Sequence, residues 1–198
     1  MKKSIKGLAL LFMAIALVFA VAACNNDKGG DKKTGGEKST ETKKKDDKEK
    51  QQADLSDFAV SVQAAMSKAY GPFAVLYKNA GAEGEDYSAE DVKTAAGEVP
   101  NAVSAFPQDI DGLTVPASLS KDDQQKLKDA LNDLKDTYAK MGDAAKDAAN
   151  VKDGKALANV TDAIDKAKEE PFGAFQSKFN EVAKSLGLGE MDFNNAMK

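Results

Sequence analysis

The chain of 198 residues contains no histidine, no arginine, no tryptophan and only one cysteine. Without histidine, the usual Ser-His-Asp and Cys-His catalytic arrangements and imidazole metal ligands are excluded. Without arginine, there is no bidentate guanidinium to bind carboxylate or phosphate groups. A single cysteine excludes an intrachain disulfide and a cysteine-ligated metal site. We therefore expect a protein that is not an enzyme and that holds no cofactor or metal.

The charge is distributed unevenly along the chain. All 28 basic residues are lysines, and 32 acidic residues bring the net charge to −4. Residues 25–50 carry nine lysines and seven acidic residues, whereas the chain from residue 53 onward carries 16 lysines and 25 acidic residues. An acidic folded part argues against nucleic-acid binding, because phosphate contacts need a basic surface. It also repels anionic lipid headgroups.

The first 24 residues have the organisation of a signal peptide. Three lysines, Lys2, Lys3 and Lys6, precede an uncharged run over residues 7–23 that is rich in Leu, Ala, Val, Phe and Ile. The alternative is a transmembrane helix that is retained. Seventeen residues lie at the short end of the spanning range, and no basic cluster follows at once, so cleavage is the better interpretation.

The run ends in Val21, Ala22, Ala23 and Cys24, which resemble the lipobox of bacterial lipoproteins: an aliphatic residue, two small residues and a cysteine. Valine stands where leucine is most common. In that family a diacylglyceryl group is attached to the cysteine, and a peptidase cleaves just before it. The resemblance implies a signal peptide over residues 1–23 and a lipid on Cys24. It also implies that the protein lies on the extracytoplasmic face of the cell membrane. We interpret the host cell as a Gram-positive bacterium. Two acyl chains meet the requirement for stable anchoring.

Residues 24–52 predict a disordered tether behind the lipidated cysteine. From residue 25 to 52 the chain has no hydrophobic residue, and it consists of Lys, Asp, Glu, Gly, Thr, Ser, Asn and Gln. Such a segment cannot bury enough apolar surface to offset the entropy of ordering. About 28 flexible residues have an r.m.s. reach of roughly 30 Å. The lysines suggest attraction to anionic lipid or wall polymer, but acidic residues interleave with them, which favours a solvated linker.

Residues 53–198 have the pattern of a helical bundle. Apolar residues recur at three- and four-residue steps, and no alternation of strands and helices appears. We expect an all-α fold, an antiparallel bundle of four to five helices with kinks at prolines, preceded by the disordered tether. The predicted helices run over residues 54–77 with an interruption at 71–72, from residue 88 to 106, from 120 to 148, from 157 to 167 and from 171 to 186.

Capping residues and one long apolar stripe support these boundaries. Ser88 with Asp91, and Ser120 with Asp123, have the spacing of capping pairs. The third predicted helix has an a/d pattern over three heptads: Leu127, Leu131, Leu134, Tyr138, Met141, Ala145 and Ala148. This stripe is consistent with packing inside the bundle or with a self-associating coiled coil, and its alanine-rich end favours the bundle.

The chain beyond residue 186 predicts a helix end and a short tail. Gly187 and Gly189 are candidates for the residue that terminates the last helix. The tail from Met191 to Lys198 contains two large apolar side chains, Met191 and Phe193, through which it can dock on the bundle.

One candidate ligand cleft lies in the first predicted helix. Tyr70, Phe73 and Tyr77 flank Gly71 and Pro72, where a broken helix would leave space and unpaired backbone groups. Core packing is the more frequent use of such aromatic residues and is the interpretation we favour. The acidic clusters match only a fragment of an EF-hand loop, so we predict no calcium site.

The sequence thus predicts a membrane-anchored extracytoplasmic lipoprotein whose acidic helical bundle is a non-enzymatic interaction module. Its partners would be the membrane, through the lipid on Cys24, and a protein or a cell-wall component. The alternative is a small-ligand-binding lipoprotein that serves a transporter or sensor. Transporter-linked binding lipoproteins typically resemble larger, two-lobed α/β proteins, which argues against it. A fully packed bundle would favour the first function, and an apolar cavity at the cleft would favour the second.

Overall fold

The computed structural model describes residues 38–197, with their side chains except those of residues 38–43 and 85. The described residues form four α-helices and three short 3₁₀ segments, and no strand occurs among them. The helices are α1 (Lys38–Asn79), α2 (Ala89–Asp111), α3 (Lys121–Ala144) and α4 (Gly154–Ser185). The 3₁₀ segments are η1 (Gly84–Asp86), η2 (Ala148–Asn150) and η3 (Asn194–Met197). The predicted all-α fold is confirmed, whereas the predicted signal peptide, the lipobox and residues 24–37 of the predicted tether lie outside the described residues.

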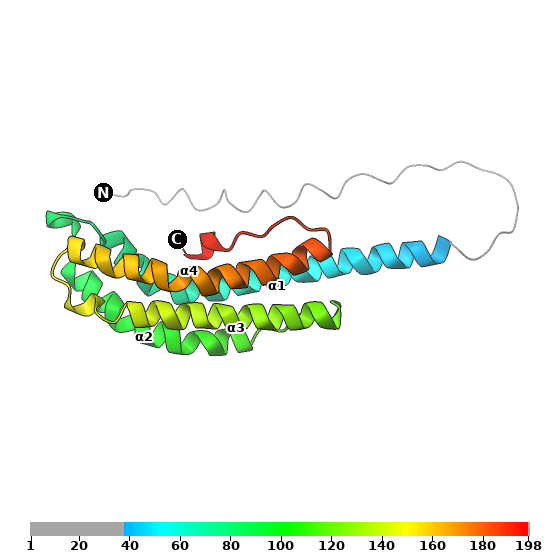
Figure 1. The fold of residues 1–198 in the computed structure, drawn as a ribbon, viewed down its shortest axis with the longest axis horizontal. Helices are drawn as coiled ribbons and strands as arrows, with labels where there is room; N and C mark the ends of the chain where they lie inside the picture. The colour runs from blue at the N-terminus through cyan, green and yellow to red at the C-terminus, as the bar shows by residue number, and fades with distance from the viewer. Residues whose placement is uncertain (1–37, 198) are drawn as a thin grey trace, which may run out of the picture. The chain divides into compact units, whose positions relative to one another are not determined.

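The four helices run alternately in opposite directions and form an antiparallel bundle (Figure 1). The most extensive contacts join α1 to α2 and α3 to α4. These two pairs meet along two less extensive interfaces, the α2–α3 seam and the α1–α4 seam. The segment η2 packs against α2, and η3 packs against α1. Short connections between consecutive helices make antiparallel neighbours the natural arrangement.

One tyrosine joins three of the helices at the centre of the core. Tyr138 of α3 is fully buried, and its hydroxyl donates a hydrogen bond to the carbonyl oxygen of Met66 in α1 at 2.7 Å. The centroid of its ring lies 4.0 Å from the ring centroid of Phe106 in α2 and 6.4 Å from that of Phe73 in α1. All seven residues of the predicted stripe on the third helix are buried. The stripe therefore packs within the bundle. This is the alternative that its alanine-rich end favoured over a self-associating coiled coil.

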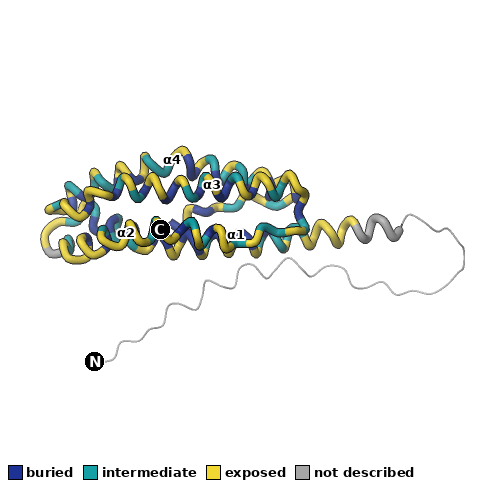
Figure 2. The backbone as a smooth tube through the Cα atoms, turned by 90° about the horizontal axis from the view of Figure 1, so that it is seen from below, coloured by how far each residue is buried: buried dark blue, intermediate teal, exposed yellow. Residues whose placement is uncertain are grey.

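The first helix begins much earlier than the sequence predicts. We expected it at residue 54, but α1 begins at Lys38, so the prediction of a disordered tether is wrong for residues 38–52. Side chains 44–50 are all exposed, and this part of the helix extends past the bundle (Figure 2). We call residues 38–50 the stalk.

Local interactions explain why the stalk is helical without a core to pack on. Lysine and glutamate are good helix formers, and together they make up most of the stalk. Lys45 pairs with Glu49 at 3.9 Å, and Lys50 pairs with Asp54 at 2.6 Å, each one turn along the helix. Extending a helix that is already nucleated costs far less than starting one. The apolar composition of a segment predicts whether it packs, but it does not exclude a helix that continues outward from a packed one.

Three helices continue through prolines. The helix α1 continues through Pro72, α2 through Pro100 and Pro107, and α4 through Pro171. The predictions that the second helix ends at residues 106–107, and that two helices meet at Pro171, are therefore wrong. The helix α2 ends instead at Asp111, and α4 is one helix of 32 residues.

Burial of the next apolar residues offsets the cost of each proline. An interior proline removes one hydrogen bond and costs about 3 kcal/mol or more. Beyond Pro171, the buried face of α4 continues in register with Phe172, Phe175 and Phe179. Burying each such side chain contributes about 1.5–3 kcal/mol, so an uninterrupted helix is favoured.

The polar residues at the helix starts act as the sequence predicts. The hydroxyl of Ser88 accepts the backbone N–H of Asp91, and that of Ser120 accepts the N–H of Asp123. Sequence analysis missed the third cap, Asp153, whose carboxylate accepts the backbone N–H of residue 156 at 2.7 Å. It starts α4 at Gly154, three residues before the predicted start of the fourth helix at residue 157.

Candidate interaction surfaces

The structure places the residues of the predicted cleft on different sides of α1. Tyr70 and Phe73 are buried in the core, at 5% and 0% exposure. Gly71 is exposed, and Pro72 and Tyr77 are half-buried. The three aromatic rings stack along the helix, with centroids 6.0 Å apart from Tyr70 to Phe73 and from Tyr70 to Tyr77. Because α1 is continuous here, Tyr70 and Phe73 fill the core.

Tyr77 instead belongs to a polar cluster that joins α1 to α4. Its hydroxyl donates to Oδ1 of Asp165 at 2.7 Å, and the same oxygen accepts Nζ of Lys168 at 2.6 Å. The ammonium of Lys168 also lies 5.4 Å from the centroid of the Tyr77 ring, within range of a cation–π interaction. The cluster therefore connects the two helices through the hydrogen bond from Tyr77 to Asp165 and the cation–π contact of Lys168 with the Tyr77 ring.

The electrostatics of this cluster fix its protonation. Burial, reinforced by the hydrogen bond to Asp165, raises the pKa of Tyr77. Burial, together with the charge of Asp165, raises the pKa of Tyr70 to about 12. Burial alone would raise the pKa of Asp165, but hydrogen bonds from Lys168 and Tyr77 outweigh it, so that pKa is lowered. At neutral pH the tyrosines are protonated and Asp165 is ionised, which makes the cluster a clamp between helices rather than an acid–base pair.

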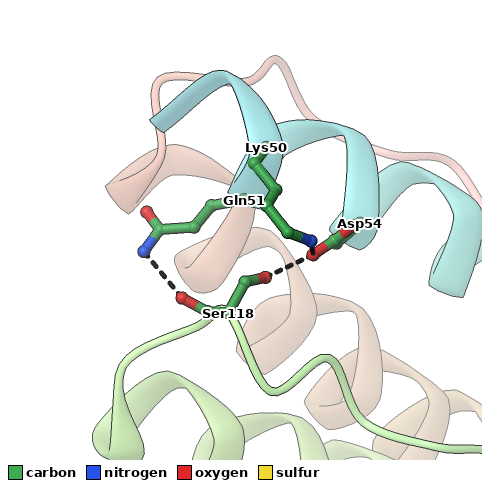
Figure 3. Close-up of polar contacts among 4 residues, drawn as sticks. All are labelled: Lys50, Gln51, Asp54 and Ser118. Carbon is green, nitrogen blue, oxygen red and sulfur yellow. Dashed lines mark hydrogen bonds and ion pairs between the residues drawn. The ribbon is translucent and has the colours of Figure 1, made fainter. Parts of the chain in front are cut away.

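A second polar cluster, the junction, holds the stalk on the bundle (Figure 3). One oxygen of Asp54 accepts Nζ of Lys50 at 2.6 Å and the hydroxyl of Ser118 at 2.5 Å. The side-chain amide of Gln51 donates to the carbonyl oxygen of Ser118 at 2.8 Å. Hydrogen bonds from Lys50 and then from Ser118 lower the pKa of Asp54. The loop between α2 and α3 is thereby bonded to the start of the packed part of α1.

The end of α4 is tied to the same region and then reverses. Gln52 donates its side-chain amide to the carbonyl oxygen of Leu186 at 2.7 Å. The next residue, Gly187, has φ of +80°, and its N–H donates to the carbonyl of Lys184. The N–H of Leu188 donates to the carbonyl of Ala183, which completes a Schellman motif. Gly187 thus ends the helix, as the sequence predicts, and sends the tail, residues 187–197, back beside α4 (Figure 1).

The tail is anchored on the α1–α4 seam by one aromatic side chain. Phe193 is fully buried, and its ring centroid lies 4.8 Å from those of Phe175 and Phe179, edge to face with both. Phe179 in turn stacks on Phe58 of α1 at 6.2 Å. Phe193 therefore completes an aromatic cluster that spans the two helices, and the predicted docking of the tail through Phe193 is confirmed.

Side chains of α4 bond the backbone of the tail. The Asn180 amide accepts the N–H of Met191 at 2.7 Å and donates to the carbonyl oxygen of the same residue at 3.2 Å. Gln176, one turn earlier, accepts the N–H of Phe193 at 3.4 Å. An extended segment without a neighbouring strand needs such partners for its backbone groups.

Side chains of α1 bond the tail from the opposite side. Gln63 donates to the carbonyl oxygen of Asp192 at 3.3 Å, and the Ser67 hydroxyl donates to that of Ala196 at 3.4 Å. Sequence analysis missed all four of these polar residues, although each helix carries its two at i, i+4 spacing. We call the surface that holds the tail the tail groove, and it consists of Gln63, Ser67, Phe175, Gln176, Phe179 and Asn180.

Two open depressions lie elsewhere on the surface. One of about 390 Å³ lies between α1 and the loop after α2, next to the junction, and includes Asp54, Asp57 and Thr114. The other, of about 510 Å³, lies along α3 and includes Lys128 and Lys135. Both are open to solvent and are lined by polar side chains together with buried apolar ones, such as Phe58 in the first and Leu131 in the second.

Comparison with known proteins assigns no family to this chain. No protein-family model, no curated protein and no solved structure matches it. Within residues 38–197, no group of three acidic, histidine or cysteine residues is arranged to hold a metal ion. The described helices include none with the length and apolarity needed to span a bilayer.

Proposed function

We propose that this protein is a lipid-anchored protein on the extracytoplasmic face of a bacterial cell membrane. It presents an acidic helical bundle as a non-enzymatic interaction module to a protein or another component of the cell envelope. The observation that carries the proposal is the run from residue 21 to Cys24, which follows a lysine-containing start and an uncharged apolar segment.

The stalk suits an anchored module. A helix rises 1.5 Å per residue, so residues 38–50 add about 20 Å of helix before the packed bundle. The bundle carries an excess of acidic residues, and anionic headgroups repel such a surface. A rigid spacer fixed by the junction therefore keeps the binding surfaces of the bundle away from the bilayer and available to a partner.

The packing at the predicted cleft supports an interaction module over a small-ligand-binding protein. The cleft residues are engaged in the fold, because Tyr70 and Phe73 pack in the core and Tyr77 is bonded to Asp165. A ligand site there would have to displace these contacts. The open surface depressions, in contrast, leave room for a polypeptide or polymer partner.

Mass spectrometry of the mature protein tests the anchor. We expect an N-terminal Cys24 that carries a diacylglyceryl group, and detergent partitioning that follows this modification. In the Cys24→Ser variant we expect neither lipid nor cleavage, with the precursor retained. A wild-type chain that keeps Met1, or that carries an unmodified Cys24, would contradict the proposal.

Cross-linking on intact cells tests the interaction function. The bundle, expressed as residues 37–198, forms one compact unit and is suited to competition for the partner. We expect it to compete with the anchored protein for a cell-envelope partner, and the binding to weaken as ionic strength rises, because exposed charges are screened by salt. Binding of substrate-sized molecules at Tyr70 or Tyr77, with no macromolecular partner, would favour the alternative function.

A further inference from the structure

The tail is held by contacts that another copy of the chain can supply equally well. Its backbone is bonded by side chains from α1 and α4, and four of the five bonds are 3.2–3.4 Å long. Bonds at the long end of the hydrogen-bond range are individually weak. The strong contact is the insertion of Phe193 between Phe175 and Phe179. Neither kind of contact requires the tail and the groove to belong to the same chain.

The connection between α4 and the tail is a single turn built on glycine. Gly187 at φ +80° makes the reversal that returns the tail to its own groove. Residues 187, 189 and 190 are exposed, and the next glycine, Gly189, has open space around its Cβ position. A different conformation at residue 187 would direct the same tail away from its own bundle.

The groove needs an occupant when its own tail leaves. Phe175 and Phe179 are both fully buried, and the Phe193 ring covers part of that surface. Without it, an aromatic patch on α4 would face water, and such patches mark interaction sites. The segment that fits the groove is residues 190–197, and a second copy of the chain carries the same segment.

We propose that two copies of this protein exchange their tails, so that Phe193 of each copy occupies the tail groove of the other. The exchanged dimer keeps the contacts that residues 190–197 make in the monomer, and it gives up the turn bonds that Gly187 and Leu188 donate to the end of α4. This inference extends the proposed function, because it identifies one partner of the anchored module as a second copy of itself.

Anchoring on a membrane favours the exchange. In dilute solution the chain's own tail has a large advantage, because a short connection gives it an effective concentration in the millimolar range. Confinement to one surface raises the local concentration of neighbouring copies. The soluble bundle is therefore expected to be mainly monomeric, with a dimer that grows as its concentration rises.

Substituting the turn glycine tests the exchange directly. A β-branched residue is strongly disfavoured at positive φ, so Gly187→Val should open the turn. For residues 37–198 we expect light scattering to give twice the monomer mass for Gly187→Val, with the helical circular dichroism unchanged. The matched control is Gly189→Val, which adds the same side chain two residues later where φ is not positive and space is open. It should stay monomeric like the wild type.

A double variant separates exchange from non-specific association. In Gly187→Val with Phe193→Ala, an exchanged dimer loses its anchor and should return to the monomer mass. An open aromatic patch that merely aggregates would keep its larger mass. Monomeric Gly187→Val, dimeric Gly189→Val or a dimer that survives the loss of Phe193 would each overturn the proposal.

A peptide tests the groove without relying on the turn. A labelled peptide of residues 186–197 should bind in trans to the Phe193→Ala bundle, or to the milder Phe193→Leu bundle, whose own tails are weakened. The peptide that carries Phe193→Ala should bind roughly tenfold or more weakly, which corresponds to about 1.4 kcal/mol.

No binding of the wild-type peptide to either folded variant would overturn the groove as a site. Binding of the peptide with monomeric Gly187→Val would show that the occupant is not a second copy. Neither result bears on the lipid at Cys24, so the anchor is tested separately.

Discussion

The two seams that join the helix pairs are built in opposite ways. In the α2–α3 seam, Gly142 faces α2, and a Cβ placed there would lie 2.8 Å from Cγ2 of Val103. In the α1–α4 seam, Phe179 contacts Phe58, and Phe193 from the tail is inserted beside them. The distance between helices depends on the side chains at the contact. A small residue therefore lets α2 and α3 meet directly, whereas large residues leave a groove in the α1–α4 seam that a separate segment fills.

The difference separates a permanent interface from an exchangeable one. The α2–α3 seam lies between consecutive helices, which meet directly where Gly142 faces Val103. The α1–α4 seam is completed by eleven residues, 187–197, that are attached at one end to α4. A seam filled by a separate segment can be emptied without unfolding either helix, which is why we place the interaction site there.

The largest expected effect is at the α1–α4 seam. Truncating Phe193 to alanine removes a fully buried ring and leaves a cavity next to Phe175 and Phe179, so the unfolding free energy should fall by about 3–5 kcal/mol. Urea unfolding followed by circular dichroism measures this. The control is Val60→Ala, where the side chain is 60% exposed and a change within about 0.5 kcal/mol is expected. A loss below 1 kcal/mol at Phe193 would show that the tail does not stabilise the seam.

The α2–α3 seam should respond to added volume rather than to removed volume. In Gly142→Ala the new methyl group would contact Val103 too closely, and we expect a loss of about 1–3 kcal/mol from overpacking. Gly97→Ala is the matched control on α2, because nothing lies within 4 Å of its Cβ position. It should stabilise the helix by about 0.5–1 kcal/mol. Equal effects of the two substitutions would mean that the helices are not in close contact at Gly142.

A third substitution weakens the contact between the two helix pairs in the core. Tyr138 lies on α3 and bonds the carbonyl of Met66 on α1, so it connects the two helix pairs. Tyr138→Phe should cost about 0.5–1.5 kcal/mol, the usual net contribution of one hydrogen bond. Tyr77→Phe removes a half-exposed bond to Asp165 and should cost less. If Tyr77→Phe proved the more costly of the two, the clamp between α1 and α4 would matter more than the central tyrosine.

The sequence predicted the helices from their apolar stripes, and these predictions were correct where burial decides the structure. The stripe from Leu127 to Ala148 is buried throughout, although α3 ends at Ala144 and not at the predicted residue 148. The serine caps of α2 and α3 make the expected bonds. The predictions were wrong at Pro107 and Pro171, because local propensity indicated a break while the buried face continued beyond each proline. They were also wrong for residues 38–52, where a helix formed without apolar residues.

The tail groove was beyond sequence analysis for a different reason. Phe193 was recognised as a docking residue, but the surface that receives it combines residues 63 and 67 of α1 with residues 175–180 of α4, which are more than 100 positions apart in the chain. Gln63 and Ser67 on one helix, and Gln176 and Asn180 on the other, look like ordinary solvent-facing residues in a helical pattern. Only the packing of α1 beside α4 turns them into partners for a third segment.

The smallest expected effect is the acid sensitivity of the α1–α4 seam. Hydrogen bonds lower the pKa of Asp165 from its unfolded value of 3.8, so its ionised form stabilises the folded state. That contribution is fully present above pH 3.8 and is lost as the pH falls through the lowered pKa of the folded state. Because Asp165 is exposed, we expect this contribution to amount to less than about 1 kcal/mol.

Thermal unfolding between pH 6 and pH 2 should show a smaller decrease in unfolding temperature for Asp165→Asn than for the wild type. Glu169→Gln, an exposed carboxylate on the same helix, should leave the decrease unchanged. If the two variants had the same pH profile, the bond from Tyr77 to Asp165 would not contribute to the seam, and the α1–α4 contact would depend on the tail and its aromatic cluster alone.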